Sequence, residues 1–271
     1  MKRAILLGAG LFLVLAFCLG PYVWLLITSL RPPAEVAADP AALPAALSLE
    51  SFRAVFSERP FFRIVGNSLL VAILSTALCL AAATAAAFAL ARLPVPGKRA
   101  VLALLLSVSM LPPVASVGPV YLAASALGLR DTAAALVMPY AALSLPLATW
   151  ILHGFFRDLP ADLHRAAKVD GCTPLQALRK VLLPPVAPGI AAAAILTFIF
   201  SWNEFLFALS LTSTDRSRTV PVEIALFAGV HEVPWGEIAA ASVVATLPIL
   251  LVVAALDRFL VRGLLAGSGK G

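Results

Sequence analysis

The chain has 271 residues, of which 61% are hydrophobic and 13% are charged, and its mean hydropathy is +0.99. This composition excludes an ordinary water-soluble globular protein, because a soluble core of this length does not need apolar runs of membrane-spanning length. The net charge of +6 is not accompanied by a basic surface interleaved with aromatic residues, so we expect no nucleic-acid partner.

Six apolar runs are each long enough for a spanning helix, which needs roughly 20 apolar residues. They cover residues 4–30, 67–91, 100–125, 132–156, 189–212 and 238–261. The first run is longer than the core of a secretion signal and lacks a small-residue cleavage site, so we expect it to remain as a helix. The fold class predicted is an all-α membrane protein, with residues 1–271 forming a single transmembrane domain of six helices.

Basic residues predict the orientation, because the cytoplasmic flanks of spanning helices retain Lys and Arg. With the amino terminus inside, 13 of the 20 basic residues fall on the cytoplasmic side: Lys2, Arg3, Arg92, Lys98, Arg99, Arg157, Arg165, Lys168, Arg179, Lys180, Arg258, Arg262 and Lys270. Both termini and the charged loop 157–188 are therefore expected in the cytoplasm. The outer segments 31–66 and 213–237 are large enough to cover the opposite face.

The charged loop is predicted to contain two short helices. Pro160 is suited to the first turn of a helix that runs to about Asp170, with Leu163, Ala166 and Ala167 on one face, and Gly171 ends it. Thr173-Pro174-Leu175-Gln176 has the pattern of a capping box at the start of a second helix. An apolar stripe then continues to Leu182, and we expect Pro184-Pro185 to end this helix.

A short helix with a small-residue face suits a groove on a soluble partner. The alternative is an amphipathic helix lying on the lipid surface. Small side chains offer lipid little apolar area, which favours the groove.

The loop resembles the cytoplasmic motif of bacterial ABC importer permeases, which reads E-A-A, three residues, G, nine residues, I-x-L-P. The matching residues are Ala166-Ala167, Asp170-Gly171 and 181–184, which read VLLP. Further matches are ARLPVPGKR at 91–99, MLPP at 110–113, GLRDT at 128–132, WNEFLFALSLT at 202–212 and the tail GLLAGSGKG at 263–271. Together they are similar to the second permease subunit of carbohydrate-uptake importers.

The resemblance implies that this chain pairs with a second permease subunit, and that each of the two inserts its loop helix into one of two cytoplasmic ATPase subunits. An extracytoplasmic binding protein would deliver the sugar, ATP and Mg would be bound by the ATPase subunits, and the tail would reach toward them. We expect no cofactor or metal on this chain, which would lie in the bacterial inner membrane. The ATPase-docking residues expected are Asp162, Leu163, Arg165, Ala166, Ala167, Asp170 and Gly171.

One position departs from the family motif. Arg165 stands where the family has glutamate, and His164 precedes it. Asp162 lies three residues earlier on nearly the same helix face and is a candidate to supply the missing negative charge. The alternative is an ATPase partner with altered electrostatics.

Asn203 and Glu204 are candidate residues of the substrate path. They lie some 20 Å along their predicted helix, at about 1.5 Å per residue, in the outer part of the bilayer. Amide and carboxylate groups there suit hydrogen bonding to an entering sugar. The alternative is an interfacial anchor, with Trp202 in the aromatic belt and Glu204 extending to water.

Two other classes of protein fit this sequence less well. An autonomous ion-coupled carrier would use Glu204 and His153 as an ion site, but none of the other spans clearly supplies an ionisable partner, and no inverted repeat is evident between the two halves. A signalling or scaffold protein would leave the loop motif unexplained. No catalytic constellation or metal-like spacing occurs, and the tail 267–271 lacks phosphate-loop spacing, so we expect no enzyme.

Trehalose or a maltose-type oligosaccharide is the preferred substrate, and glycerol 3-phosphate or a monosaccharide is the alternative.

Overall fold

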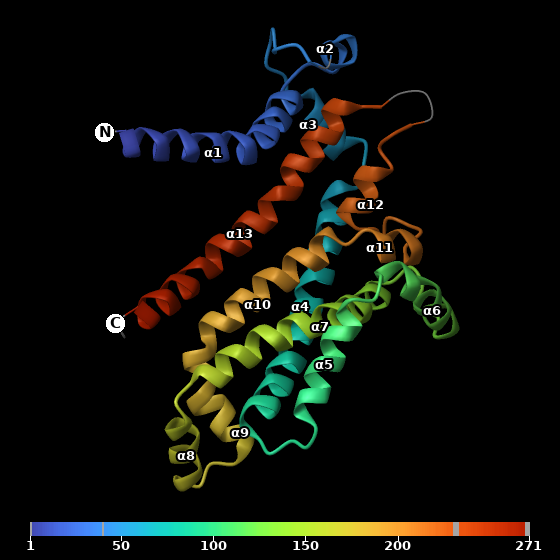
Figure 1. Ribbon diagram of the computed structural model, residues 1–271. Coiled ribbons are helices and arrows are strands. Elements are labelled where there is room, and N and C mark those ends of the chain that lie inside the picture. The colour runs from blue at the N-terminus through green and yellow to red at the C-terminus, as the bar shows by residue number, and fades with distance from the viewer. Residues whose placement is uncertain (1, 40, 230–232, 269–271) are drawn as a thin grey trace. The chain divides into compact units, whose positions relative to one another are not determined.

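A computed structural model describes residues 2–39, 41–229 and 233–268 (Figure 1), and these residues form helices and turns without a β-strand. The all-helical prediction is confirmed. The chain divides into two compact units, one of residues 1–65 and 219–248 and the other of residues 66–218 and 249–271.

The first unit contains three helices near the amino terminus, the start of a long helix, and two later elements. Its elements are α1 (Lys2–Ser29), α2 (Pro33–Ala38), α3 (Glu50–Ser57), the first turn of α4 (Phe61–Arg92), α12 (Val220–Ala225) and the first part of α13 (Trp235–Ser268). Arg59 connects distant segments of this unit, because its guanidinium lies 3.9 Å from the centre of the Phe227 ring and 3.5 Å from the Glu237 carboxylate.

The second unit holds the rest of α4 and of α13 together with the middle of the chain. Its other elements are α5 (Lys98–Ser109), α6 (Pro113–Ala126), α7 (Ala133–Asp158), α8 (Ala161–Val169), α9 (Pro174–Gln176), the π-helix η1 (Ala177–Leu182), α10 (Leu183–Asn203) and α11 (Leu206–Leu211).

Five helical stretches are long and apolar enough to cross a membrane: Leu7–Ser29, Phe61–Arg92, Ala133–Asp158, Pro174–Asn203 and Trp235–Phe259. The predicted span 100–125 is the exception, because α5 and α6 meet at an angle of 91°. The break falls at Pro112, whose backbone is extended, since consecutive prolines remove backbone donors and disfavour helical geometry in the residue before each of them. The described residues therefore supply five spans, or six if the bent pair counts as one.

The prediction that Pro184-Pro185 ends a helix was wrong. The chain stays helical from Pro174 to Asn203, and the two prolines lie in the first turn of α10, directly after η1. A proline ring in an α-helix collides with the carbonyl four residues earlier, and the wider turn of a π-helix provides the room that avoids this collision. The second helix of the charged loop therefore continues into a spanning helix without a break.

The core of the second unit lies between α4, α7, η1 and α10. Its buried side chains are Cys79, Ala83, Ala87, Phe88, Ala141, Ala148, Leu152, Phe156, Leu178, Leu182, Val186 and Ala193. Small residues let the helices approach closely. At Gly189 of α10 an added Cβ would lie only 2.5 Å from the Phe155 ring of α7, so this contact requires glycine.

Candidate functional site

The loop 157–188, here called the docking loop, is organised around α8. The helix begins directly after Pro160 and ends at Asp170, and Gly171 follows with φ +74°, a left-handed conformation that favours glycine. The Cys172 N–H donates to the Ala167 carbonyl at 2.9 Å, which closes the helix end. The predicted helix and its glycine stop are confirmed.

The second predicted helix start is also confirmed. The Thr173 N–H donates to Oε1 of Gln176 at 2.8 Å, and the Gln176 N–H donates to Oγ1 of Thr173 at 3.3 Å. This reciprocal capping box begins α9, which continues through η1 into α10. The capping box at Thr173 and the turn at Gly171 together fix the angle between α8 and α9.

The faces of α8 differ in exposure. His164 and Ala167 are buried against the chain itself. All the other residues from 161 to 171 are exposed, namely Ala161, Asp162, Leu163, Arg165, Ala166, Lys168, Val169, Asp170 and Gly171. Of the predicted docking residues, all but Ala167 therefore face outward. Sequence reasoning missed Val169, whose apolar side chain is 87% exposed, more than the other large apolar side chains exposed on this loop, Leu163 and Leu175.

The buried face of α8 packs on η1, and its His164 also contacts α4. The His164 ring meets the Phe88 ring edge to face, with centroids 5.9 Å apart. Arg92, at the end of α4, donates to the carbonyl groups of Phe156 and Leu159, which connects α4 to the end of α7. Desolvation, with the positive charges of Lys168 and Arg92, lowers the pKa of His164 below its ordinary value.

The position that departs from the family motif has a local partner. The Arg165 guanidinium lies 3.3 Å from the Asp162 carboxylate, and both side chains are mostly exposed. Asp162 is therefore partly neutralised within α8. Such an exposed pair contributes only about 0–1 kcal/mol to stability, so a docking partner can compete for either charge.

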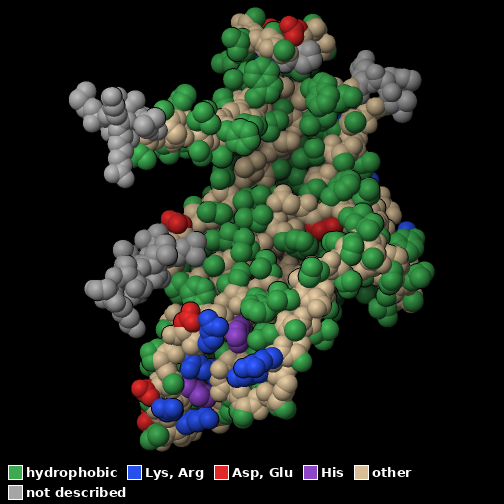
Figure 2. Space-filling view, viewed as in Figure 1, with side chains coloured by type: hydrophobic (Ala, Val, Ile, Leu, Met, Phe, Trp, Pro, Cys, Tyr) green, Lys and Arg blue, Asp and Glu red, His purple; other side chains and the backbone are tan. Residues whose placement is uncertain are grey.

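Charge is concentrated at this end of the second unit. Figure 2 shows Lys, Arg and His side chains gathered around the docking loop, whereas hydrophobic side chains dominate the visible face of the spanning helices. Hydrocarbon excludes such a group of charges, so this end lies in water or in contact with a soluble protein.

The two substrate-path candidates lie where α10 ends. The Asn203 amide is exposed and donates to the Ile199 carbonyl at 2.9 Å. The Glu204 carboxylate accepts from the N–H groups of Phe207 at 3.0 Å and Ala208 at 3.3 Å, so it caps α11. The buried Tyr140 of α7 interacts electrostatically with Glu204. The predicted run 189–212 is thus two helices with Glu204 at their junction.

Sequence reasoning missed a polar cluster centred on Asp131, which has φ +60°. Its carboxylate accepts from the N–H groups of Ser213 at 2.8 Å and Thr214 at 2.9 Å, and from the hydroxyl groups of Thr214 and Ser217. Partial desolvation acts to raise the pKa of Asp131, but these hydrogen bonds outweigh it and hold the pKa well below its usual range.

Asn67 holds the other end of the same loop. Its amide nitrogen donates to the carbonyl groups of Asp215 and Arg218, each at 3.0 Å. The segment 213–218, here called the outer loop, is therefore fixed from two sides. The only sequence signal for this cluster was the match at 128–132.

The residues considered for an ion site are far apart. His153 packs on Trp150, with ring centroids 6.4 Å apart, whereas Glu204 lies beside Tyr140. Tyr140 and His153 are separated by roughly 20 Å along α7, at about 1.5 Å per residue. The two residues therefore do not form one site.

The chain matches the family described as binding-protein-dependent transport system inner membrane component over residues 77–265. It is 41% identical to the trehalose transport system permease protein SugB of Mycobacterium tuberculosis over 261 residues, covering 96% of this chain and 95% of that protein. It is 41% identical to the sulfoquinovosyl glycerol permease SmoH of Agrobacterium fabrum, in a match that covers 100% of this chain and 93% of SmoH. It is 38% identical to the trehalose/maltose permease MalG of Thermococcus litoralis, in a match that covers 100% of this chain and 98% of MalG.

The fold matches a solved structure as well. A bacterial ABC transporter involved in import of the acidic polysaccharide alginate superposes with a TM-score of 0.79 at 19% identity, over 95% of this chain and 96% of that chain. A second structure of the alginate transporter, in complex with a periplasmic protein carrying an alginate pentasaccharide, superposes with a TM-score of 0.71 at 16% identity, covering 96% of each chain. The architecture described above is therefore that of an ABC importer permease.

Proposed function

Because the chain belongs to the family of binding-protein-dependent transport system inner membrane components, we propose that it is one permease subunit of an ATP-driven sugar importer. It works with a second permease subunit, two cytoplasmic ATPase subunits and an extracytoplasmic binding protein. It has no hydrolytic role of its own, and ATP with Mg is bound by the ATPase subunits. The docking loop and both termini lie in the cytoplasm, in line with the distribution of basic residues.

The geometry of the docking loop carries this proposal. The exposed face of α8 is available to an ATPase, and Gly171 and the capping box set its angle. Because α8 packs on η1, and η1 belongs to the continuous helical stretch Pro174–Asn203, a displacement of α8 is transmitted to a spanning helix. Closure of an ATPase dimer would in this way switch the paired permeases between inward-open and outward-open states.

The preferred substrate is trehalose or a maltose-type oligosaccharide, because relatives with these names match along nearly the whole chain. Glycerol 3-phosphate and monosaccharides are the alternatives.

Asn203 is better placed than Glu204 to contact a substrate, because its side chain is exposed while the Glu204 carboxylate caps α11. An ion-coupled carrier is disfavoured by the separation of His153 and Glu204. The proposed contact of the tail 263–271 with the ATPase falls partly outside the described residues.

The direct test replaces Gly171 with valine, which cannot adopt φ +74° without strain. We expect sugar uptake by the reconstituted importer and retention of the ATPase subunits to fall at least about tenfold, because α8 no longer projects at the docking angle. The matched control is Gly154→Val in α7, where an added Cβ meets nothing within 4 Å and φ is ordinary. Unchanged uptake and unchanged ATPase retention in Gly171→Val would reject the docking role.

A further inference from the structure

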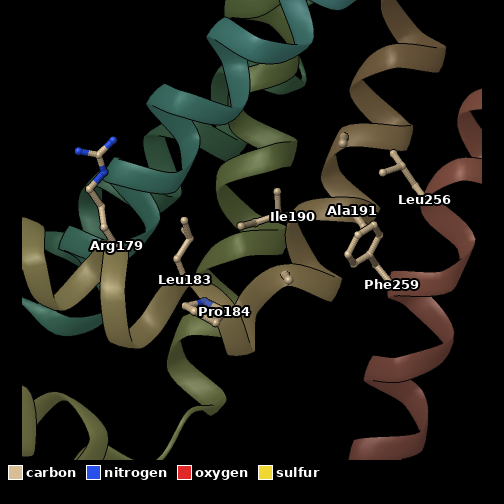
Figure 3. A pocket seen from close by; sticks show the side chains of 9 residues that line it. Arg179, Leu183, Pro184, Ile190, Ala191, Leu256 and Phe259 are labelled. Atoms are coloured by element: carbon tan, nitrogen blue, oxygen red, sulfur yellow. The ribbon is translucent and has the colours of Figure 1, made fainter.

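An apolar groove lies between α10 and the carboxyl-terminal part of α13, both within the second unit. Its volume is about 370 Å³, within the range of about 300–1,000 Å³ typical of small-molecule sites. Figure 3 shows that the side chains of the first turns of α10 separate Arg179, at one end, from α13 at the other. The principal lining residues are Arg179, Leu183, Pro184, Ile190, Leu256 and Phe259.

The walls of this groove belong to two helical stretches that qualify as membrane spans, Pro174–Asn203 and Trp235–Phe259. The groove therefore opens toward the bilayer or toward another membrane subunit. Leu183, Ile190 and Leu256 offer a sugar no hydrogen bonds. Hydrocarbon chains suit these walls.

Positive charge lies at the end of the groove formed by η1. The Arg179 side chain lines the groove and is exposed, and Lys180 beside it is exposed as well. At the other end, on α13, the Arg258 guanidinium lies 5.0 Å from the centre of the Phe259 ring, and the acidic Asp257 precedes it. The excess of positive charge therefore comes from Arg179 and Lys180. An occupant of this groove is expected to carry an anionic group next to its apolar part.

We propose that the groove binds an anionic phospholipid. Its acyl chain lies against α10 and α13, and its phosphate accepts hydrogen bonds from the Arg179 guanidinium, whose planar donors match phosphate oxygens. Basic pockets between spanning helices on the cytoplasmic side are the usual sites for such headgroups. The assignment to the inner leaflet rests on the proposed function, because it follows the orientation of the docking loop. An apolar helix of the second permease is the competing occupant, but it would leave the Arg179 charge without an anion.

The test uses the purified importer complex in nanodiscs and measures which lipids stay bound during native mass spectrometry. We expect phosphatidylglycerol to be retained over phosphatidylcholine. Arg179→Gln should weaken this retention roughly fivefold, and Arg179→Lys, which keeps the charge but loses the planar donors, should weaken it less than Arg179→Gln does. Ala187→Phe, which fills the groove, should weaken it as well. Arg157→Gln is the matched control, because Arg157 is exposed at the end of α7 and pairs with its neighbour Asp158.

Three results would overturn the proposal. The first is equal retention of the two lipids. The second is an equal loss in Arg157→Gln and Arg179→Gln, which would indicate attraction to the charged surface in general. The third is a photo-cross-link from Leu256→p-benzoylphenylalanine to the second permease instead of to lipid. Sugar uptake measured on the same preparations separates the two hypotheses: active transport without selective lipid retention rejects the lipid site alone, whereas lipid retention without transport or ATPase association rejects the proposed function alone.

Discussion

The outer loop 213–218 and the docking loop 157–188 are stabilised in opposite ways. The outer loop is held by hydrogen bonds from within the chain, four to Asp131 and two from Asn67. The docking loop instead buries His164 and Ala167 and leaves Val169 exposed next to a solvent-exposed ion pair. A segment whose polar groups are hydrogen-bonded within the chain can keep its conformation without a partner. A segment that exposes apolar surface is suited to bind a partner that covers this surface.

The largest effect on loop stability is expected from Asp131→Ala, which removes every hydrogen bond that the carboxylate accepts from the outer loop. A hydrogen bond to a charged group contributes about 1.5–3 kcal/mol when it is buried and less when it is exposed, as the bonds from Ser213 and Thr214 are, so amide exchange at these two residues should accelerate roughly tenfold. Asp131→Asn, which tolerates the positive φ, should have a smaller effect. Hydrogen exchange measured by mass spectrometry checks this, and unchanged exchange would show that Asp131 does not hold the loop.

An effect of similar size, on a different property, is expected at the docking loop. Val169→Asp places a charge where the partner is expected to cover an apolar side chain, so ATPase association should weaken about tenfold while the permease keeps its thermal stability. Leu127→Asp is the matched control, because Leu127 is 71% exposed but lies at the end of α6. Pull-down of the ATPase subunits by each variant measures the difference. Equal association of both variants would contradict the contrast between the two loops.

Lowering the pH should destabilise the docking loop but not the outer loop, and this effect should be smaller than the effects of the substitutions above. Because the folded chain lowers the pKa of His164, the neutral form stabilises the docking loop, and this stabilisation is lost as the pH falls below the ordinary value of about 6.5. The pKa of Asp131 is also lowered, so its carboxylate stays ionised and the outer loop is unaffected at pH 5.5.

Hydrogen exchange at pH 7.5 and 5.5, corrected for the intrinsic rate, should show loosening of α8 alone. The variant His164→Leu should abolish this pH dependence. A docking loop equally protected at both values, or an outer loop that opens at pH 5.5, would contradict the assignment.

The smallest effect is expected from the ion pair on α8. Asp162→Asn and Arg165→Gln should each change the free energy of unfolding by less than about 1 kcal/mol, because both side chains are mostly exposed. Chemical denaturation of the permease measures this. A larger change would show that the pair holds the loop together and is not free to exchange with a partner.

Local patterns in the sequence were enough to predict most of the spanning helices and the two short helices of the docking loop. Long apolar runs predict spanning helices because hydrocarbon requires every backbone group to be satisfied within the helix. Gly171 and the pair Thr173 and Gln176 predict a turn and a helix start because their geometry depends on neighbouring residues only. The resemblance to the family motif assigns the docking role to the loop 157–188.

Only the tertiary structure decided which surfaces are free and which are used internally. Asp131 and the outer loop are 82 to 86 residues apart in the chain, so no local pattern links them. The burial of His164 depends on Phe88 of α4, and the capping role of Glu204 depends on where α10 ends. Short-range periodicity reports which backbone shape a segment adopts, whereas these contacts depend on how distant helices pack.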